Sequence, residues 1–221
     1  MKTKDMLMPE PWSITKNKGK IMRIFAGALK GMNILSPKDS LITRPTSAKI
    51  REAILHKVQD ELQQSVFIDL FSGTGAVAIE AVSRGAQGAY LVENNKNILK
   101  ILRKNFDLAH ERMLKQGFSL KPFQILPIDA TKALKKIKTD SEESSFVIWA
   151  DPPYSNCLSW LAELSEQNLD LLDKTSLIIV EADRELITKE EFKIKNWTRS
   201  FEKIYGGTAV IGWTKNQKEA T

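Results

Sequence analysis

The chain has 221 residues, of which 42% are hydrophobic and 27% charged, and this balance supports one α/β domain with a substantial core and a small appendage. Its single cysteine, Cys157, rules out an internal disulfide and a cluster of cysteine metal ligands. We therefore predict no metal site. No apolar stretch reaches the length of a bilayer span, so we also predict a cytoplasmic protein with no membrane partner.

Positive charge is concentrated at the start of the chain. The formal net charge is +6, but residues 1–60 hold twelve Lys or Arg against five Asp or Glu, a net of +7. A basic segment beside a nearly neutral body is typical of a patch that binds nucleic-acid phosphates without reading the base sequence. For residues 1–21 a solvated, disordered extension rich in lysine is the open alternative.

Residues 22–62 are predicted to form a small unit that faces RNA. The segment from Arg23 to Leu35 has a short β pattern interrupted by glycines, which favours a hairpin. From Ser47 to Leu62, apolar residues recur every four positions, which predicts a helix. We expect the positive side chains of this unit to contact RNA, and the candidates are Arg23, Lys30, Arg44 and Arg51. For Arg51 and Glu52 the open alternatives are a position near the cofactor, a surface ion pair, and solvated charges.

Residues 63–221 alternate strand and helix patterns and are predicted to form the main domain. Strands are expected near Val66, Ala89, Gln124, Phe146 and Ser176, with helices near Ala76, Ile98, Lys132 and Leu158 between them. This alternation predicts a Rossmann-like, mostly parallel sheet with right-handed crossovers. The end of the chain differs, because Gly206-Gly207 separates two strand patterns and so predicts a hairpin with an antiparallel last strand.

A buried-type strand runs into a glycine-bearing turn and then into a helix pattern over residues 66–78. Gly73 and Gly75 would let the backbone approach a ligand closely, and the N–H groups at the helix start favour oxygen-bearing groups. Phe71 takes the first glycine position of the dinucleotide-binding pattern. The turn therefore disfavours a bound pyrophosphate, and with it a nicotinamide-dependent oxidoreductase.

Acidic residues end the strands that follow this turn. Glu93 lies about 20 residues beyond it, where a carboxylate can accept hydrogen bonds from ribose hydroxyls. Asp129, before Ala130, can accept from an adenine amine or cap the helix after it, and the two roles are compatible. Together with Asp69 and Asp151, these residues are expected at the carboxyl edge of the sheet, where open α/β sheets bind ligands. The pattern predicts an adenosyl ligand.

The tetrapeptide Asp151-Pro152-Pro153-Tyr154 directly follows an apolar strand pattern, residues 146–150. The exocyclic amine of a nucleobase is a poor nucleophile, because its lone pair is delocalised into the ring. If Asp151 and the carbonyl of Pro152 accept its hydrogens, the lone pair can be held toward an electrophile. The prolines would stiffen the loop and Tyr154 would stack on the base. The alternative is a plain strand-terminating turn.

These motifs together resemble the bacterial small-subunit ribosomal RNA guanine-N2-methyltransferases of the RsmD type. The resemblance covers nearly the whole chain and departs from it only in residues 1–21. It rests on Arg23 to Gly27, Arg44 to Thr46, Ile50 to Glu52, Asp69 to Gly75, the strand end at Glu93, and Asp151 to Tyr154.

The resemblance implies a class I methyltransferase fold with S-adenosyl-L-methionine as the methyl donor. It also implies a guanosine of small-subunit ribosomal RNA as the acceptor. We expect this RNA within a ribosomal particle as the partner, with naked RNA as the open alternative. The turn, the strand ends and the resemblance give the expected cofactor contacts as Asp69, Phe71, Ser72, Gly73, Thr74, Gly75, Glu93, Asn94, Asp129 and Ala130. The expected catalytic residues are Asp151, Pro152, Pro153 and Tyr154.

Two other functions remain open. One is methylation of an adenine or cytosine amine in DNA, because the tetrapeptide itself does not identify the base. Such enzymes usually carry a further target-recognition domain, for which this chain has little room. The other is a non-catalytic RNA-binding factor for ribosome assembly, which the intact Asp151 and Tyr154 disfavour. A protein glutamine methyltransferase is less favoured, because that family resembles Asn-Pro-Pro-Tyr instead.

Overall fold

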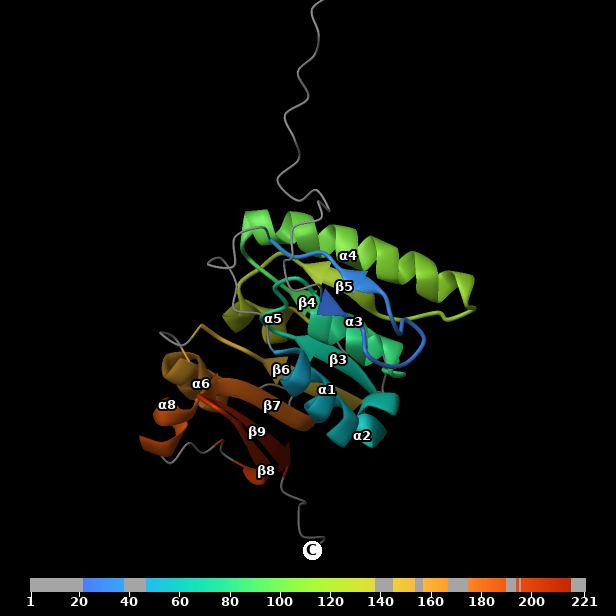
Figure 1. Ribbon diagram of the computed structural model, residues 1–221. Coiled ribbons are helices and arrows are strands. Elements are labelled where there is room, and N and C mark those ends of the chain that lie inside the picture. Colours follow the sequence, from blue (N-terminus) through green and yellow to red (C-terminus); the bar gives the residue numbers. More distant parts are fainter. Residues whose placement is uncertain are drawn as a thin grey trace, which may run out of the picture.

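A seven-stranded sheet in the order β5-β4-β3-β6-β7-β9-β8 forms the centre of the molecule (Figure 1). The structure is a computed structural model, and it describes residues 22–37, 47–137, 145–153, 157–166, 175–189, 194 and 196–215. The predictions made for residues 1–21, Arg44 and Tyr154 lie outside this part of the chain.

The parallel part of the sheet comes from strands that the sequence pattern predicts. It consists of β3 (Ser65–Asp69), β4 (Gly88–Val92), β5 (Phe123–Leu126), β6 (Ser145–Ala150) and β7 (Thr175–Asp183). The hairpin of β8 (Trp197–Tyr205) and β9 (Thr208–Lys215) turns at Gly206-Gly207, and β9 pairs antiparallel with β7. Both the parallel sheet and the antiparallel last strand are confirmed.

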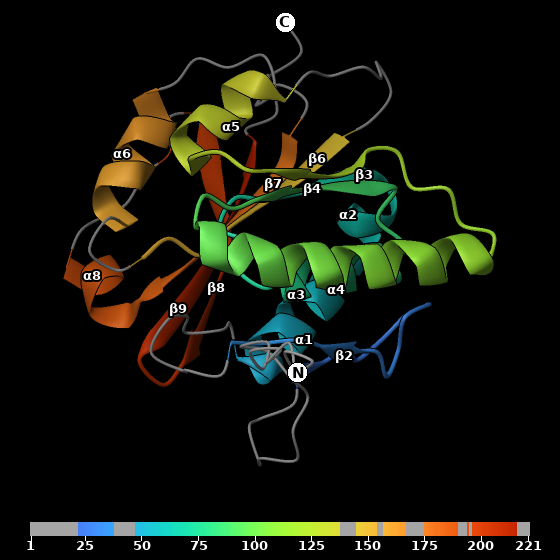
Figure 2. The same ribbon diagram turned by 90° about the horizontal axis from the view of Figure 1, so that it is seen from above.

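Helices cover both faces of the sheet and bury a separate apolar core on each (Figure 2). One face is covered by α1 (Ala48–Lys57), α2 (Gln59–Gln63), α3 (Ala76–Ser83) and α4 (Lys96–Lys115). The opposite face is covered by α5 (Ala130–Lys136) and α6 (Cys157–Glu166), and α8 (Arg184–Lys189) follows β7. No helix in the described ranges is long and apolar enough to cross a membrane.

The N-terminal hairpin packs against the main domain. Its strands β1 (Met22–Arg23) and β2 (Asn33–Ile34) pair antiparallel, and its apolar side chains share a core with α3 and α4. Gly27 has φ +79, and a Cβ there would lie 1.7 Å from the carbonyl oxygen of Ser83. Because only glycine permits this close approach, the hairpin can sit directly on the end of α3.

The single helix expected from Ser47 to Leu62 is two helices. Val58, with φ −105 and ψ 26, leaves the helical conformation, so α1 ends at Lys57 and α2 begins at Gln59. Val58 and Leu62 nevertheless stay buried with Ile50 and Ile54. The four-residue apolar period therefore predicted the buried face correctly and missed the break.

Candidate functional site

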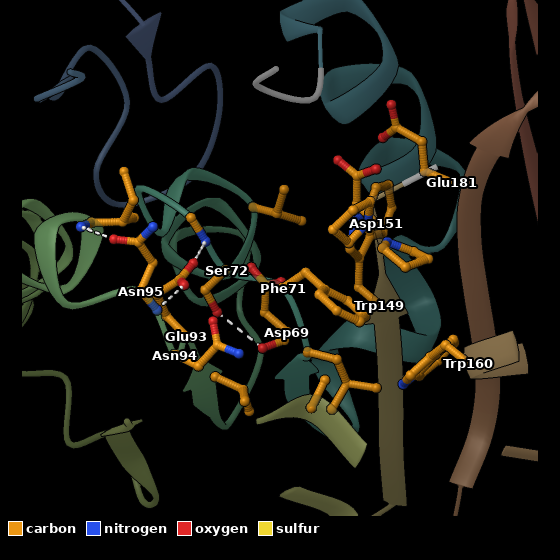
Figure 3. A pocket seen from close by; sticks show the side chains of 18 of the residues that line it. Asp69, Phe71, Ser72, Glu93, Asn94, Asn95, Trp149, Asp151, Trp160 and Glu181 are labelled. Atoms are coloured by element: carbon orange, nitrogen blue, oxygen red, sulfur yellow. Dashed lines mark hydrogen bonds between the residues drawn. The ribbon is translucent and has the colours of Figure 1, made fainter. Parts of the chain in front are cut away.

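A cavity of about 630 Å³ opens at the carboxyl edge of the parallel strands (Figure 3). Residues from the ends of β3, β4, β6 and β7 line it, as does the segment after β5. It brings together most of the predicted site, namely Asp69, Phe71, Ser72, Gly73, Thr74, Glu93, Asn94, Asp129, Ala130, Asp151, Pro152 and Pro153. The cavity thus lies at the edge where open α/β sheets bind ligands.

The two glycines of the turn have different roles. Gly73 has φ +52 and would place a Cβ in open space, so its backbone is exposed to the cavity it lines. Gly75 has φ +82, and a Cβ there would lie 2.6 Å from Cδ1 of Leu102. It caps α3, faces the core and does not line the cavity. Gly75 therefore shapes the turn, and its contact with the cofactor stays a prediction.

Glu93 ties the glycine turn to the end of β4. Its carboxylate accepts hydrogen bonds from the backbone N–H of Gly73 at 3.0 Å and of Asn95 at 2.7 Å (Figure 3). A carboxylate has about four acceptor positions, so capacity remains for further donors. Glu93 thus presents acceptors beside the exposed backbone of Gly73.

Asp129 is the N-cap of α5, as one of its two expected roles requires. It accepts from the backbone N–H of Thr131 at 2.9 Å and from its hydroxyl at 2.8 Å, while Asn94 donates to the other oxygen at 3.1 Å. The backbone hydrogen bond from Thr131, followed by its hydroxyl, holds the pKa of Asp129 below its ordinary value. An ionised acceptor therefore lines the cavity next to Ala130.

Asp69 is buried at the end of β3 and lines the cavity. Burial raises the pKa of this carboxyl to about 7, the backbone N–H of Phe71 opposes the rise, and the negative charge of Asp151 adds to it. Its Oδ2 has no hydrogen-bond partner within the described ranges. The carboxyl of Asp69 therefore changes charge near neutral pH.

This titration predicts a pH-dependent stability. The folded pKa of about 7 lies above the unfolded value of 3.8, so the folded state binds the proton more tightly. The contribution of the Asp69 carboxyl to the free energy of unfolding is fully present below about pH 4, and it is lost as pH rises through about 7. Relative to wild type, Asp69→Asn should gain stability by on the order of 1.4 kcal/mol per pH unit across this window and level off above it. Urea unfolding of both proteins from pH 5 to 8 measures this, and a constant difference would show that Asp69 does not titrate.

The cavity wall contains two tryptophans that the sequence analysis did not single out, Trp149 and Trp160, beside the expected cofactor contact Phe71. Trp149 is fully buried two residues before Asp151, and its indole N–H has no hydrogen-bond partner in the described part of the chain. Phe71 and Trp160 meet edge to face, with ring centroids 5.5 Å apart, on another side of the cavity (Figure 3). Pro152 is buried and Pro153 is exposed, so the loop after β6 is anchored at its first proline.

Arg51 corrects the prediction of an RNA-binding side chain. It is fully buried, its Nε donates to Glu80 at 2.7 Å, and one Nη donates to the carbonyl of Arg23 at 2.7 Å. Arg84 donates to the other oxygen of Glu80 at 2.7 Å. A guanidinium inside the protein cannot reach an RNA phosphate, and the surface ion pair with Glu52 is equally wrong. Arg51 does line the cavity, so its other expected position, near the cofactor, stays a prediction.

Comparison with known proteins places the chain in a family. A family profile described as Conserved hypothetical protein 95 matches residues 22–214. Ribosomal RNA small subunit methyltransferase D of Escherichia coli strain K12 is 30% identical over 191 residues, which are 85% of this chain and 87% of that protein. The chain belongs to this RsmD-type family. The match begins at Met22, where the family resemblance was expected to begin.

Solved structures of other proteins share the fold of this chain. The structure of yhhF from Escherichia coli has a TM-score of 0.69 at 25% identity and covers 90% of this chain and 100% of that one. An RNA methyltransferase from Salinibacter ruber in complex with S-adenosyl-L-homocysteine has a TM-score of 0.51 at 19% identity, over 79% of this chain and 95% of that one. The fold is the α/β, Rossmann-like fold of class I methyltransferases, as predicted.

Proposed function

We propose that this protein transfers a methyl group from S-adenosyl-L-methionine to the exocyclic N2 amine of a guanosine in small-subunit ribosomal RNA. One observation carries the proposal. The same cavity is lined by the glycine turn at Gly73 with the carboxylate of Glu93, and by Asp151 and Pro152. The first group suits an adenosyl donor and the second a planar amine. Membership in the RsmD-type family supports ribosomal RNA as the acceptor.

The residues on the donor side fit S-adenosyl-L-methionine, which supplies an electrophilic methyl group on a positively charged sulfur. Glu93 would hold the ribose hydroxyls, and the backbone of Gly73 allows a close approach. Asp129, Asn94 and Ala130 line the part of the cavity assigned to adenine. The negative charge of Asp151 adds potential that favours a cation, and Asp69 adds to it when its carboxyl is ionised. The related Salinibacter ruber protein binds S-adenosyl-L-homocysteine on this fold.

On the acceptor side, Asp151 and the Pro152 carbonyl would accept the two amine hydrogens and turn the nitrogen lone pair toward the methyl group. This is catalysis by positioning and electrostatics, without a covalent enzyme intermediate. After transfer the nitrogen becomes acidic, and Asp151 or water would take its proton. Tyr154 is proposed as the face on which the base stacks. Extruding the base costs a few kcal/mol, which contacts to phosphates and to the cavity must offset.

Glu93→Ala is expected to weaken binding of S-adenosyl-L-methionine by about 1.5 to 3 kcal/mol, because charge-assisted hydrogen bonds to ribose are lost. Equilibrium titration of the folded variant, beside wild type, measures this. NAD in a parallel titration should bind poorly to both proteins. Unchanged affinity in Glu93→Ala would remove Glu93 from the donor site.

The exposed positive side chains of the hairpin are proposed to bind RNA phosphates. Arg23 and Lys30 are exposed, whereas Arg44 lies outside the described residues. Replacing Arg23 and Lys30 with Gln should make RNA association less salt-dependent, because each phosphate contact contributes roughly 0.7 to 0.9 to the log–log slope. Binding measured between 50 and 200 mM salt gives the slope. An unaltered slope would mean that these two residues form only a solvated surface.

The reaction itself is tested by transfer of tritiated methyl groups to small-subunit particles from methylation-deficient cells, followed by nucleoside analysis. The expected product is N2-methylguanosine, with a comparison of particles and naked RNA to identify the substrate form. A methylated adenine or cytosine would overturn the assignment of the base. Absence of transfer to either substrate would favour the non-catalytic alternative.

A further inference from the structure

The strand order places Asp69 between the donor side and the acceptor side of the cavity. In the sheet β3 lies between β4 and β6, and Asp69 ends β3, whereas Glu93 follows β4 and Asp151 follows β6 (Figure 3). Neighbouring strands lie about 4.8 Å apart, so Asp69 is about one strand spacing from each flanking position. The proposed function assigns the ribose to Glu93 and the acceptor amine to Asp151. The sulfur that joins the ribose to the transferred methyl group is therefore expected near Asp69.

The protein satisfies the carboxyl group of Asp69 only in part. The residue is 1% exposed and lines the cavity. Hydrogen bonds from the backbone of Phe71 and Ala78 lower its pKa, but Oδ2 has no hydrogen-bond partner in the described part of the chain. The charges of Asp151 and Glu93 both oppose its ionisation. A carboxyl group kept from water among like charges costs free energy, which a cation of a bound molecule would offset.

The rest of the cavity wall is also acidic. Among the described residues one basic side chain lines it, Arg51, and this guanidinium donates to the buried carboxylate of Glu80. Acidic side chains are more numerous, and the six that line the cavity are Asp69, Glu93, Asp129, Asp151, Glu163 and Glu181. Salt screens buried charges much less than exposed ones, so Asp69 acts most strongly on a ligand. This balance favours a positively charged group beside Asp69.

We propose that Asp69 makes the site distinguish the methyl donor from its by-product, by attracting the cationic sulfonium of S-adenosyl-L-methionine and not the neutral sulfide of S-adenosyl-L-homocysteine. The inference rests on the proposed function. During transfer the N–C bond forms as the S–C bond breaks, and the bonding pair stays on sulfur as a lone pair. The positive charge passes to the nitrogen, whose proton then goes to Asp151 or water. The by-product has lost its attraction to Asp69, so it leaves readily and inhibits weakly.

The expected size of the effect follows from the charges. Two unit charges about 6 Å apart, at an effective dielectric constant of about 20, change an affinity by more than tenfold. The preference is greatest above about pH 7, where Asp69 is ionised while Glu93, Asp151, Glu181 and Arg51 line the same cavity. Because Asp151 opposes this ionisation, Asp69 ionises more readily in Asp151→Ala and offsets the lost charge. Donor binding by that variant therefore stays nearly intact.

The test is isothermal titration at pH 8 with three ligands. They are S-adenosyl-L-methionine, S-adenosyl-L-homocysteine and sinefungin, in which a carbon bearing an ammonium group replaces the methylated sulfur. Wild type should bind both cationic ligands at least roughly tenfold more tightly than S-adenosyl-L-homocysteine. Asp69→Asn keeps the shape of the side chain but cannot carry its charge. It should lower the affinity for both cations about tenfold and leave that for S-adenosyl-L-homocysteine unchanged or higher.

Asp107→Asn is the matched control, because Asp107 lies exposed on α4 and does not line the cavity. It should bind all three ligands as wild type does. Equal wild-type affinities for S-adenosyl-L-methionine and S-adenosyl-L-homocysteine would overturn the inference. So would an equal loss of all three ligands in Asp69→Asn, because Asp69 would then hold the α-ammonium group that they share.

Wild-type protein that binds none of the three ligands would overturn the proposed function as well. Asp69→Asn is expected to fold, because it removes a carboxyl group whose burial opposes ionisation. If it does not fold, the comparison of the three ligands in wild type still decides.

Discussion

Glu80→Ala is expected to lower the free energy of unfolding by about 3 to 5 kcal/mol, because it removes the carboxylate that pairs with two buried guanidinium groups. The side chains of Arg51 and Arg84 are 0% and 5% exposed, and both donate to Glu80. Without Glu80 their charges would remain buried and unpaired. Local structure should be weakened most where α1, α3 and the N-terminal hairpin meet.

Urea unfolding of wild type and Glu80→Ala measures this difference. Glu111→Ala is the matched control, because Glu111 pairs with Lys115 on the exposed side of α4. Exposed ion pairs contribute little to stability, so this variant should have nearly the same free energy of unfolding as wild type. Amide hydrogen exchange in the hairpin should also accelerate in Glu80→Ala, since Arg51 donates to the carbonyl of Arg23. If Glu80→Ala and Glu111→Ala were equally stable, the buried network of Arg51, Glu80 and Arg84 would not stabilise the fold as we expect.

Asp151→Ala is expected to reduce the methylation rate roughly a hundredfold to a thousandfold, while S-adenosyl-L-methionine binding stays nearly intact. The magnitude, about 2.7 to 4 kcal/mol, follows from removing one group that acts in the transition state. Tyr154→Ala should also lose activity, whereas Tyr154→Phe should keep most of it, because stacking needs the ring. A Tyr154→Phe rate as low as that of Tyr154→Ala would show that the hydroxyl is what the site uses.

The sequence predicted the frame of the site well, because that frame depends on local pattern. The apolar run before Asp69 and the following glycine turn form β3 and the start of α3, as expected. Parallel strands align their ends at one edge, so Glu93, Asp129 and Asp151 had to meet there. The backbone contacts of Glu93 and the helix cap at Asp129 follow from the same geometry.

Long-range partners were the part that the sequence could not supply. Arg51 lies next to Ile50 on α1, and nothing local shows that its partner is Glu80, 29 residues away on α3. A signal was nevertheless present, because Glu80 interrupts an otherwise apolar helix. Glu181 interrupts the apolar strand β7 in the same way, and its position in the cavity wall was not predicted. For Gly75, the close approach to Leu102 is likewise a long-range contact that the local sequence does not show.

The central claim is that Asp151 orients a guanine amine for direct methylation, and single-turnover transfer to small-subunit particles tests it most directly. Wild type and Asp151→Ala are compared at saturating S-adenosyl-L-methionine, with binding of this donor measured separately. We predict N2-methylguanosine from wild type and a rate lower by roughly a hundredfold to a thousandfold from Asp151→Ala, at similar donor affinity. A near-normal rate in the folded variant would contradict the mechanism.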